Sequence, residues 1–347
     1  MLKKWQFWGG VAISAVLLYF AMRGLHLEQV WEGVKKANYW WLIPGVLVYF
    51  MGVWARAWRW HYLLRPLKKI PTNTMFPIVT MGYMGNNIIG ARIGEVLRAV
   101  ILKDREGVPV SASLATVIVE RIFDAVVMLG FVFFNLGALE GLTHDSGFVG
   151  NIQQLSIWGT VIFVGALVVF LAAAMMPKKA EAIIFWLVDR LIPEKAREKT
   201  KGIATKFLDG LESLRTPKDV LMVFVTTVVI WLFETGKYYF VMLGFDFRVS
   251  FFALMLMNGI ANLATTLPSA PGNIGTFDAP GIAVLKAYGV PAEMAASYTL
   301  VLHAALWLPI TLLGLYYYFK QPLRWGKDIS REEMNEELAE EESQPPA

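Results

Sequence analysis

Long apolar stretches constrain this chain more than any other feature of its sequence. They cover residues 5–22, 40–60, 74–90, 111–138, 155–176, 219–243, 251–268 and 294–319. Several reach about 20 residues without a charge, the length that a helix needs to cross hydrocarbon roughly 30 Å thick. Hydrophobic residues make up 56% of the chain and charged residues only 17%, too few charges for an ordinary soluble protein. The sequence therefore predicts an all-α, polytopic membrane protein.

Two stretches of the chain resemble each other. The first contains Asn87, residues 90–95 (GARIGE) and 107–109 (GVP), then Glu120, Arg121 and Asp124. The second contains Asn262, residues 271–278 (PGNIGTFD) and 289–291 (GVP), then His303. Aligning the two GVP triplets places His303 opposite Arg121. Broken apolar segments in matching halves of a hydrophobic chain are typical of inverted-repeat transporters, so we expect two inverted repeats.

The distribution of Lys and Arg predicts the orientation in the membrane. The loop 139–153 contains neither residue, whereas the segment 177–218 contains ten of them, which places the second segment in the cytoplasm. Both termini then lie in the cytoplasm if 74–103 and 251–288 are broken or re-entrant hairpins that enter from opposite sides. Ten ordinary spans with two short helices are the alternative. Either arrangement predicts an integral protein of the cell membrane.

The remaining segments complete the predicted organisation. A transporter-like membrane domain is expected over 1–327, with repeat hairpins at about 74–138 and 251–319. Apolar stripes within 180–216 predict amphipathic helices on the inner membrane surface, or a connector packed on the bundle. The segment 328–347 is predicted to be an acidic cytoplasmic tail. Residues 5–22 are interpreted as a retained first helix rather than a cleaved signal peptide.

Ionisable residues inside predicted spans are costly and usually mark a pathway or an ion pair. The candidate substrate-binding residues are Arg92, Glu95, Arg98, Glu120, Arg121, Asp124, Asp278 and His303. Guanidinium groups bind phosphate in a bidentate manner, so the three arginines are predicted to receive an anion. Helix starts at Ile93 and Ile274 are expected to direct amide groups at it. A structural network of ion pairs is the alternative.

Other features carry less information. Arg56, Arg59 and Trp60 are predicted to be interfacial anchors, with binding of lipid headgroups as the alternative. Glu234 and Lys237 lie three residues apart in a further span. Four asparagines in matched places are predicted to cap broken backbone, with contact to a ligand as the alternative: Asn86, Asn87, Asn258 and Asn262. Cysteine is absent and the four histidines are scattered, so we expect no metal, no cofactor and no catalytic residue.

Three motifs together resemble one family. They are Asn-x-x-Gly-Ala-Arg-Ile-Gly-Glu-x-x-Arg at 87–98, Glu-Arg-x-x-Asp at 120–124 and Pro-x-x-Pro-Gly-x-x-Gly at 268–275. This pattern is similar to the membrane region of lysylphosphatidylglycerol synthases, a flippase-like domain that also occurs as free-standing proteins. The resemblance covers about 5–320 and implies movement of a lipid between leaflets by a member without the synthase domain. Gly90 replaces a common Pro, and Asn273 replaces a common Gly.

We therefore expect a transporter of an anionic lipid, either a phospholipid or a lipid-linked phosphate, rather than an enzyme. Its expected partners are anionic membrane lipids, with no nucleic acid, and a homo-oligomer is left open. One alternative is an intramembrane lipid-pyrophosphate phosphatase that uses Ser269 and His303. Another alternative is a membrane partner of a separate lipid-modifying enzyme, with 180–216 as its docking face.

Overall fold

A computed structural model describes residues 4–89, 92–140 and 146–320 of the chain. Every regular element within these ranges is helical, which confirms the predicted all-α class. The elements of the first half are α1 (Lys4–Met22), α2 (Leu27–Lys36), η1 (Tyr39–Trp41), α3 (Leu42–Leu64), α4 (Thr72–Ile89), α5 (Ile93–Glu106), α6 (Val110–Glu140) and α7 (Ser146–Met175). The predicted acidic tail and Gly90 lie outside the described residues.

The second half continues the helical architecture. Its elements are α8 (Pro177–Leu191), α9 (Glu194–Asp209), η2 (Glu212–Leu214), α10 (Pro217–Leu243), α11 (Phe251–Ala264), η3 (Pro271–Asn273), α12 (Asp278–Ala287) and α13 (Ala292–Lys320). Four helices of the described chain are long and apolar enough to cross a membrane: Tyr39–Leu64, Ile157–Met175, Pro217–Leu243 and Ala292–Lys320. The pair formed by α1 and α2 passes the same test but bends by 88°. The protein is therefore an integral membrane protein.

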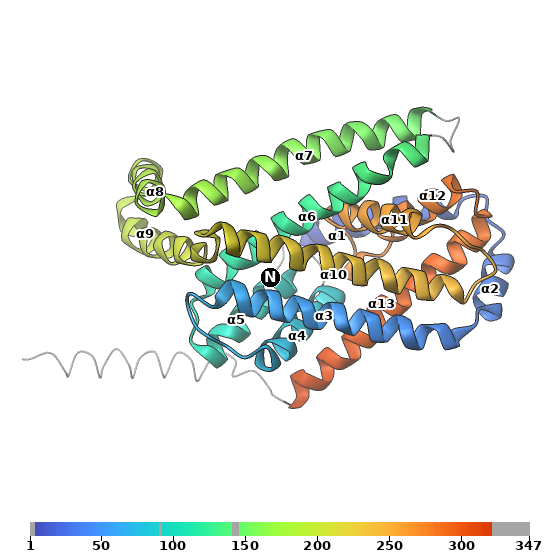
Figure 1. Ribbon diagram of the computed structural model, residues 1–347, viewed down its shortest axis with the longest axis horizontal. Helices are drawn as coiled ribbons and strands as arrows, with labels where there is room; N and C mark the ends of the chain where they lie inside the picture. The colour runs from blue at the N-terminus through green and yellow to red at the C-terminus, as the bar shows by residue number, and fades with distance from the viewer. Residues whose placement is uncertain (1–3, 90–91, 141–145, 321–347) are drawn as a thin grey trace, which may run out of the picture.

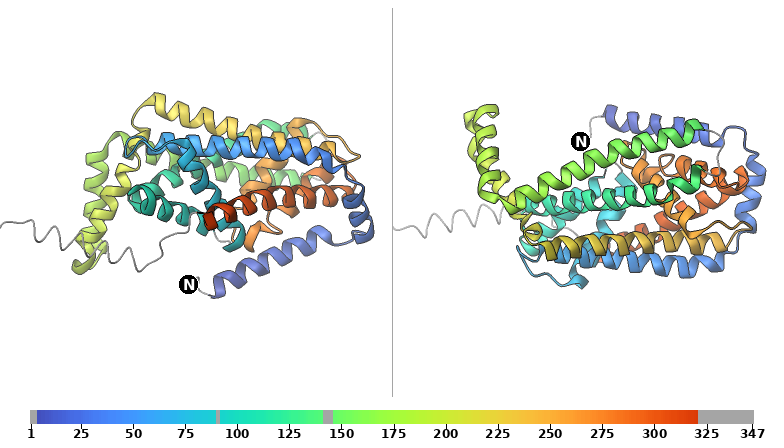
Figure 2. Two further views of the ribbon diagram at one scale, coloured as in Figure 1. Left: turned by 90° about the horizontal axis from the view of Figure 1, so that it is seen from below. Right: turned by 45° about the horizontal axis from the view of Figure 1, so that its top comes forward.

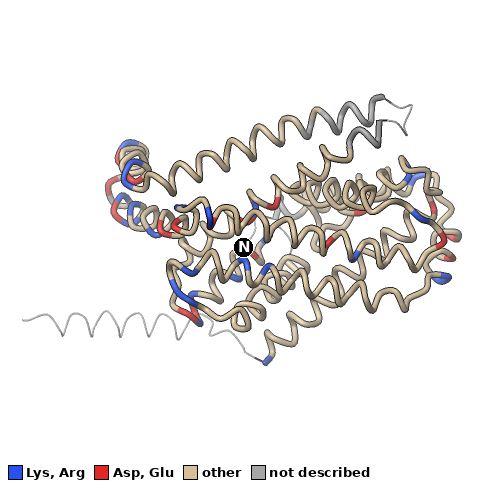
Figure 3. Tube along the Cα trace, in the orientation of Figure 1, with Lys and Arg blue, Asp and Glu red and all other residues tan. Residues whose placement is uncertain are grey.

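The long helices run lengthwise through the molecule, with shorter helices at both ends (Figure 1). Helices α3 and α10 lie side by side in opposite directions, since Tyr62 near the end of α3 bonds to Asp219 near the start of α10. Helices α8 and α9 stand across one end of the bundle and α2 lies at the other (Figure 2). The end with α8 and α9 carries many of the Lys and Arg residues (Figure 3). Two large apolar cores form, one mainly from α3 to α6 and one mainly from α10 to α13.

The segment 180–216 contains an exposed apolar helix face and a part that packs on the bundle. Ile183, Trp186 and Leu191 of α8 are exposed, so this helix presents an apolar face away from the bundle. Leu211 and Leu214, at the end of the same segment, are each 1% exposed and belong to the core around α3. Thus α8 has the character of a surface helix, whereas the residues after α9 pack against the bundle.

Helices α4 and α5 form a tight hairpin because glycines remove the side chains between them. A Cβ atom at Gly94 would lie 1.8 Å from the carbonyl oxygen of Gly82, and one at Gly85 would lie 3.0 Å from the Cα atom of Gly94. Asn86 accepts a hydrogen bond from the Gly94 amide at 2.8 Å, which agrees with its predicted capping role. The close packing of α4 on α5 therefore depends on three glycines: Gly82, Gly85 and Gly94.

The turn between α11 and α12 corrects one prediction. Ile274 does not begin a helix; α12 begins four residues later, at Asp278. Gly272 and Gly275 have φ of 73° and 81°, and this left-handed backbone prevents a helix from starting earlier. The amide of Gly275, three residues before α12, donates to Oδ2 of Asp278 at 2.8 Å, so that carboxylate stabilises the turn in front of the helix. Asn273 also has positive φ, at 59°, a conformation that Asn tolerates better than most residues.

Candidate functional site

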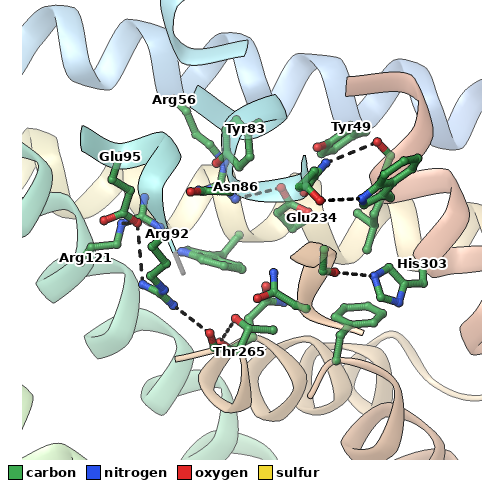
Figure 4. Close-up of a pocket in the computed structure, with 18 residues that line it drawn as sticks. Tyr49, Arg56, Tyr83, Asn86, Arg92, Glu95, Arg121, Glu234, Thr265 and His303 are labelled. Atoms are coloured by element: carbon green, nitrogen blue, oxygen red, sulfur yellow. Dashed lines mark hydrogen bonds and ion pairs between the residues drawn. The ribbon is translucent and has the colours of Figure 1, made fainter. Parts of the chain in front are cut away.

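A polar cavity of about 160 Å³ lies between the two halves of the chain. Its walls come from α3, α4, α5, α6, α10, α11 and α13, and from the turn between α11 and α12 (Figure 4). The polar or charged side chains that line it are Tyr49, Arg56, Tyr83, Asn86, Asn87, Arg92, Glu95, Arg121, Trp231, Glu234, Asn262, Thr265, Asn273, His303 and Trp307. Such a density of polar groups between apolar helices marks a functional site in a membrane protein.

Arg92, Glu95 and Arg121 form the wall contributed by the first hairpin and α6. Oε1 of Glu95 lies 3.6 Å from Nε of Arg121 and 3.8 Å from Nη1 of Arg92. The side chains of Arg92 and Arg121 are 38% and 30% exposed, and their guanidinium groups point into the cavity (Figure 4). Arg92 itself has a left-handed backbone, with φ of 54°, directly before α5. One carboxylate therefore serves two arginines that both remain accessible.

The wall formed by α3 and α10 contributes a second group of charges. Nη2 of Arg56 lies 2.8 Å from Oε1 of Glu234, and Lys237 bonds to the other oxygen of the same carboxylate. The Arg56 guanidinium also lies 4.9 Å from the ring centroid of Trp231, and Lys237 lies 4.3 Å from that of Tyr49. Again a single carboxylate neutralises two cations.

A third group of charges is buried behind the cavity. Arg59, at 1% exposure, donates to Asp124 at 2.8 Å and to Thr227 at 2.7 Å, and Arg98 bonds to Glu120. Asp124 also lies 3.0 Å from Nη2 of Arg121. These pairs connect α3, α5, α6 and α10 through the interior. Their arrangement matches the structural network that the sequence left open as an alternative.

The structure thus separates the candidate residues that the sequence analysis placed together. Arg92, Glu95, Arg121 and His303 line the cavity. Glu120 and Asp124 do not line it, Arg98 lines only a recess of about 20 Å³ beside it, and Asp278 lies behind His303.

The charges of the three groups do not balance. The six cations are Arg56, Arg59, Arg92, Arg98, Arg121 and Lys237, and the four carboxylates are Glu95, Glu120, Asp124 and Glu234. Six positive minus four negative charges leaves an excess of two positive charges. The Nε atoms of Arg56 and Arg121, two arginines that line the cavity, have no hydrogen-bond partner among the described residues. A bound anion would supply the missing negative charge.

His303 forms the opposite wall with the turn before α12. Its Nδ1 lies 2.7 Å from Oδ1 of Asp278, and its Nε2 lies 2.8 Å from the carbonyl oxygen of Gly272. A carbonyl oxygen can only accept, so Nε2 carries a proton. Both ring nitrogens are therefore engaged by acceptors within the second hairpin.

Sequence reasoning missed two residues of the site. The prediction that Arg56, Arg59 and Trp60 are interfacial anchors is wrong, because they are 5%, 1% and 0% exposed. The two arginines pair with carboxylates, and Trp60 donates to Thr116 at 2.9 Å. The available signal was the i, i+3 spacing of the two arginines, which matches that of Glu234 and Lys237. The sequence analysis expects no metal site. Among the described residues, no group of three His, Asp or Glu side chains could hold a metal ion.

Asparagines join the two halves and brace the second. Asn87 donates to Thr311 of α13 at 2.9 Å, and Asn258 donates to Thr235 of α10 at 3.0 Å. Asn262 donates back to the Asn258 side chain at 2.7 Å. Unlike Asn86, these three asparagines hold one helix to another or brace a single helix, so capping describes only part of their role.

The fold and the site define a polytopic helical membrane protein with a charged cavity between its halves. The family described as "Lysylphosphatidylglycerol synthase TM region" matches residues 7–314, and the chain belongs to this family. A UPF0104 membrane protein of Methanothermobacter thermautotrophicus is 24% identical over 88% of this chain and 91% of its own length. One of Pyrococcus horikoshii is 26% identical over 88% of this chain and 93% of its own.

A longer relative is named glycosyltransferase AglD, from Haloferax volcanii. It is 24% identical over 79% of this chain, and the aligned part is 47% of its own length. This chain therefore spans about half of that protein. No solved structure matches the chain.

Proposed function

We propose that the protein moves an anionic lipid, either a phospholipid or a lipid-linked phosphate, between the two leaflets of the membrane. The observation that carries this proposal is the excess of two positive charges around a cavity inside a membrane protein. Phosphate is the anionic group common to these lipids, and Arg56, Arg92 and Arg121 offer guanidinium groups at the cavity wall. Membership of the lysylphosphatidylglycerol synthase membrane-region family supports a lipid as the cargo.

We propose further that the two halves are inverted repeats. The pattern of helix packing among eight helices stays the same when each helix of the first half is exchanged with its counterpart in the second half. The counterparts are α3 and α10, α4 and α11, α5 and α12, and α6 and α13. Helix α4 packs on α13 just as α11 packs on α6, and α3 packs on α10 at the centre. This arrangement supports hairpins α4–α5 and α11–α12 that enter the membrane from opposite sides.

Side-chain contacts between α3 and α10 support the same relationship. Arg59 donates to Thr227 at 2.7 Å, and Lys237 lies 4.3 Å from the ring centroid of Tyr49. Lys237 lies 237 − 59 = 178 positions after Arg59, and Thr227 lies 227 − 49 = 178 positions after Tyr49. Each contact is therefore the counterpart of the other under one shift along the chain, as a two-fold axis between α3 and α10 requires.

The transport cycle follows from this symmetry. With the termini and the basic end that carries α8 and α9 in the cytoplasm, α4–α5 opens from the cytoplasm and α11–α12 from outside. Rocking of one repeat against the other exposes the cavity to each side in turn. The headgroup occupies the cavity while the acyl or isoprenoid tails stay in the bilayer. Glu95 and the His303–Asp278 pair keep the arginines and the second turn in place.

A leaflet-asymmetry assay in proteoliposomes tests the proposal. Wild type should move a fluorescent phosphatidylglycerol and a polyprenyl phosphate faster than protein-free vesicles, and Arg121→Gln should reduce that rate at least tenfold. Arg190→Gln is the matched control, because it removes one arginine from α8, outside the cavity. Background-level movement by both wild type and Arg121→Gln, over a panel of anionic lipids, would overturn the proposal.

We also propose that the protein is not a phosphatase. His303 has acceptors on both ring nitrogens, and Oγ of Ser269 donates to Asn273 at 3.1 Å, so neither residue stands ready as base or nucleophile. Phosphate release from a polyprenyl pyrophosphate, abolished by His303→Ala, would instead support an enzyme.

The glycosyltransferase-named relative favours a second candidate function. Because this chain matches about half of that protein, a separate lipid-modifying enzyme is a reasonable partner for it. The exposed apolar face of α8, with Ile183, Trp186 and Leu191, is the proposed docking surface in that case. Stable co-purification of such an enzyme, together with no lipid movement by the isolated protein, would favour this function over transport.

A further inference from the structure

A second polar pocket lies where α3 ends and α10 begins. It has a volume of about 370 Å³ and is lined by Tyr62, Arg65, Pro66, Lys69, Ser213, Thr216, Lys218 and Asp219. None of these residues lines the central cavity. The pocket therefore has its own chemistry, independent of the proposed lipid movement.

Positive charge dominates this pocket. Arg65, Lys69 and Lys218 oppose a single carboxylate, that of Asp219, which leaves 3 − 1 = 2 positive charges. The carboxylate is already occupied on both oxygens, because Tyr62 donates to Oδ1 at 2.5 Å and Thr216 donates to Oδ2 at 2.6 Å. Asp219 is thus held by neutral hydroxyl groups, and no ion pair joins it to the three cations of the pocket.

A buried hydroxyl group in the same pocket has no partner. Ser213 is 3% exposed, and its Oγ forms no hydrogen bond with any described residue. A buried polar group without a partner is costly in a folded protein and needs an explanation. The start of the 27-residue helix α10 adjoins it, with Thr216 as the N-cap, and the positive end of a helix dipole favours an anion there.

We propose that this pocket binds a phosphate group, with Ser213 donating to one oxygen and the three cations balancing its charge. The phosphate belongs either to a lipid headgroup at the membrane surface or to a small soluble phosphate. The two sources share the same chemistry in the pocket, and they differ only in whether the phosphate arrives attached to a membrane.

The test uses the full chain and two probes. Inorganic phosphate is titrated against protein in detergent, and phosphatidic acid is offered in phosphatidylcholine nanodiscs, with thermal stabilisation of the protein as the readout. Ser213→Ala removes the unpartnered hydroxyl, so the variant should fold at least as well as wild type. We expect it to weaken phosphate binding about tenfold, the usual effect of losing a hydrogen bond to a charged group. Lys218→Gln should weaken it to a similar degree.

Ser113→Ala is the matched control, because Ser113 is also buried with an unpartnered hydroxyl but lies outside the pocket. Stabilisation by inorganic phosphate indicates a soluble ligand, and stabilisation by phosphatidic acid alone indicates a lipid headgroup; both support the site. Each titration is repeated in an Arg121→Gln background, where the central cavity is altered and the effect of Ser213→Ala should persist. If Ser213→Ala responds to both probes as wild type does, or neither probe stabilises the protein, the proposal is overturned.

Discussion

His303 and Asp278 hold a proton between them: Nδ1 of the imidazole lies 2.7 Å from Oδ1 of the carboxylate. Since the second ring nitrogen donates to the carbonyl oxygen of Gly272 at 2.8 Å, the ring cannot turn without breaking a contact on one side. The imidazole therefore joins α13, the first turn of α12 and the left-handed turn before it.

A double-mutant cycle tests this connection. His303→Gln leaves the Asp278 carboxylate, which is 2% exposed, without its partner, and we expect the free energy of unfolding to fall by about 3 kcal/mol. Asp278→Asn should also destabilise, whereas the double variant should lose less than the sum, with a coupling energy of about 1–3 kcal/mol. The free energy of unfolding is measured in detergent for the wild type, the two single variants and the double variant. Additive effects would show that the two side chains do not interact.

Replacing Arg92 by glycine should increase the stability of the protein and decrease its lipid movement. Its left-handed backbone, with φ of 54°, costs a non-glycine residue about 1 kcal/mol or more, and its contact with Glu95 at 3.8 Å is weak. Arg92→Gly should therefore raise the free energy of unfolding by about 1 kcal/mol while reducing lipid movement. Arg92→Ala is the control, since it removes the same side chain but keeps the strain. Equal stability of the two variants would contradict the interpretation.

Gly94 is expected to tolerate no side chain. A Cβ atom there would lie 1.8 Å from the carbonyl oxygen of Gly82, so Gly94→Ala must separate α4 from α5. We expect a loss of about 3 kcal/mol or more, or a failure to fold, measured as yield of monodisperse protein and as unfolding midpoint. Gly130→Ala in α6 has open space around its Cβ and should be neutral or stabilising by up to about 1 kcal/mol. Similar behaviour of the two variants would disprove close packing of the hairpin.

Helix positions were largely predictable from the sequence, because apolar length is a local property. The predicted stretch 219–243 corresponds to α10 (Pro217–Leu243), and the stretch 111–138 to α6 (Val110–Glu140). The start of α12 was not predictable from apolar length. It depends on the left-handed backbone at Gly272 and Gly275, which interrupts an apolar run.

The candidate site was predictable only in part, because it depends on contacts between distant segments. The sequence analysis treats Arg92 and Arg98 alike, as arginines that receive an anion, yet Arg92 lines the cavity and Arg98 pairs with Glu120 in the interior. Residue spacing alone does not separate the two: Arg92 precedes α5 and has a left-handed backbone, so it does not share the helical face that carries Arg98. The burial of Arg59 also depends on a distant partner, Thr227, which lies 168 residues further along the chain.

The Arg56–Glu234 pair provides a test of the two-fold relationship between α3 and α10. Nη2 of Arg56 lies 2.8 Å from Oε1 of Glu234, and the two positions differ by 178, the shift that relates the other contacts between these helices. Two residues that a two-fold axis exchanges and that also contact each other must lie near that axis, and the symmetry gives them similar environments. Reversing the charges should therefore be tolerated there better than at an ordinary buried ion pair.

We expect Arg56→Glu and Glu234→Arg each to lower the free energy of unfolding by about 3–5 kcal/mol, because each places like charges together in the interior. The double reversal should restore about half of that loss, since Lys237 also loses its bond to the carboxylate of Glu234. Asp124 and Arg59, paired at 2.8 Å but related by no such shift, are the control pair. Their double reversal should recover little, because Glu120 and Thr227 would then face the wrong groups. Equal recovery at both pairs would remove this support for inverted repeats, since ordinary complementarity would then explain the Arg56–Glu234 result.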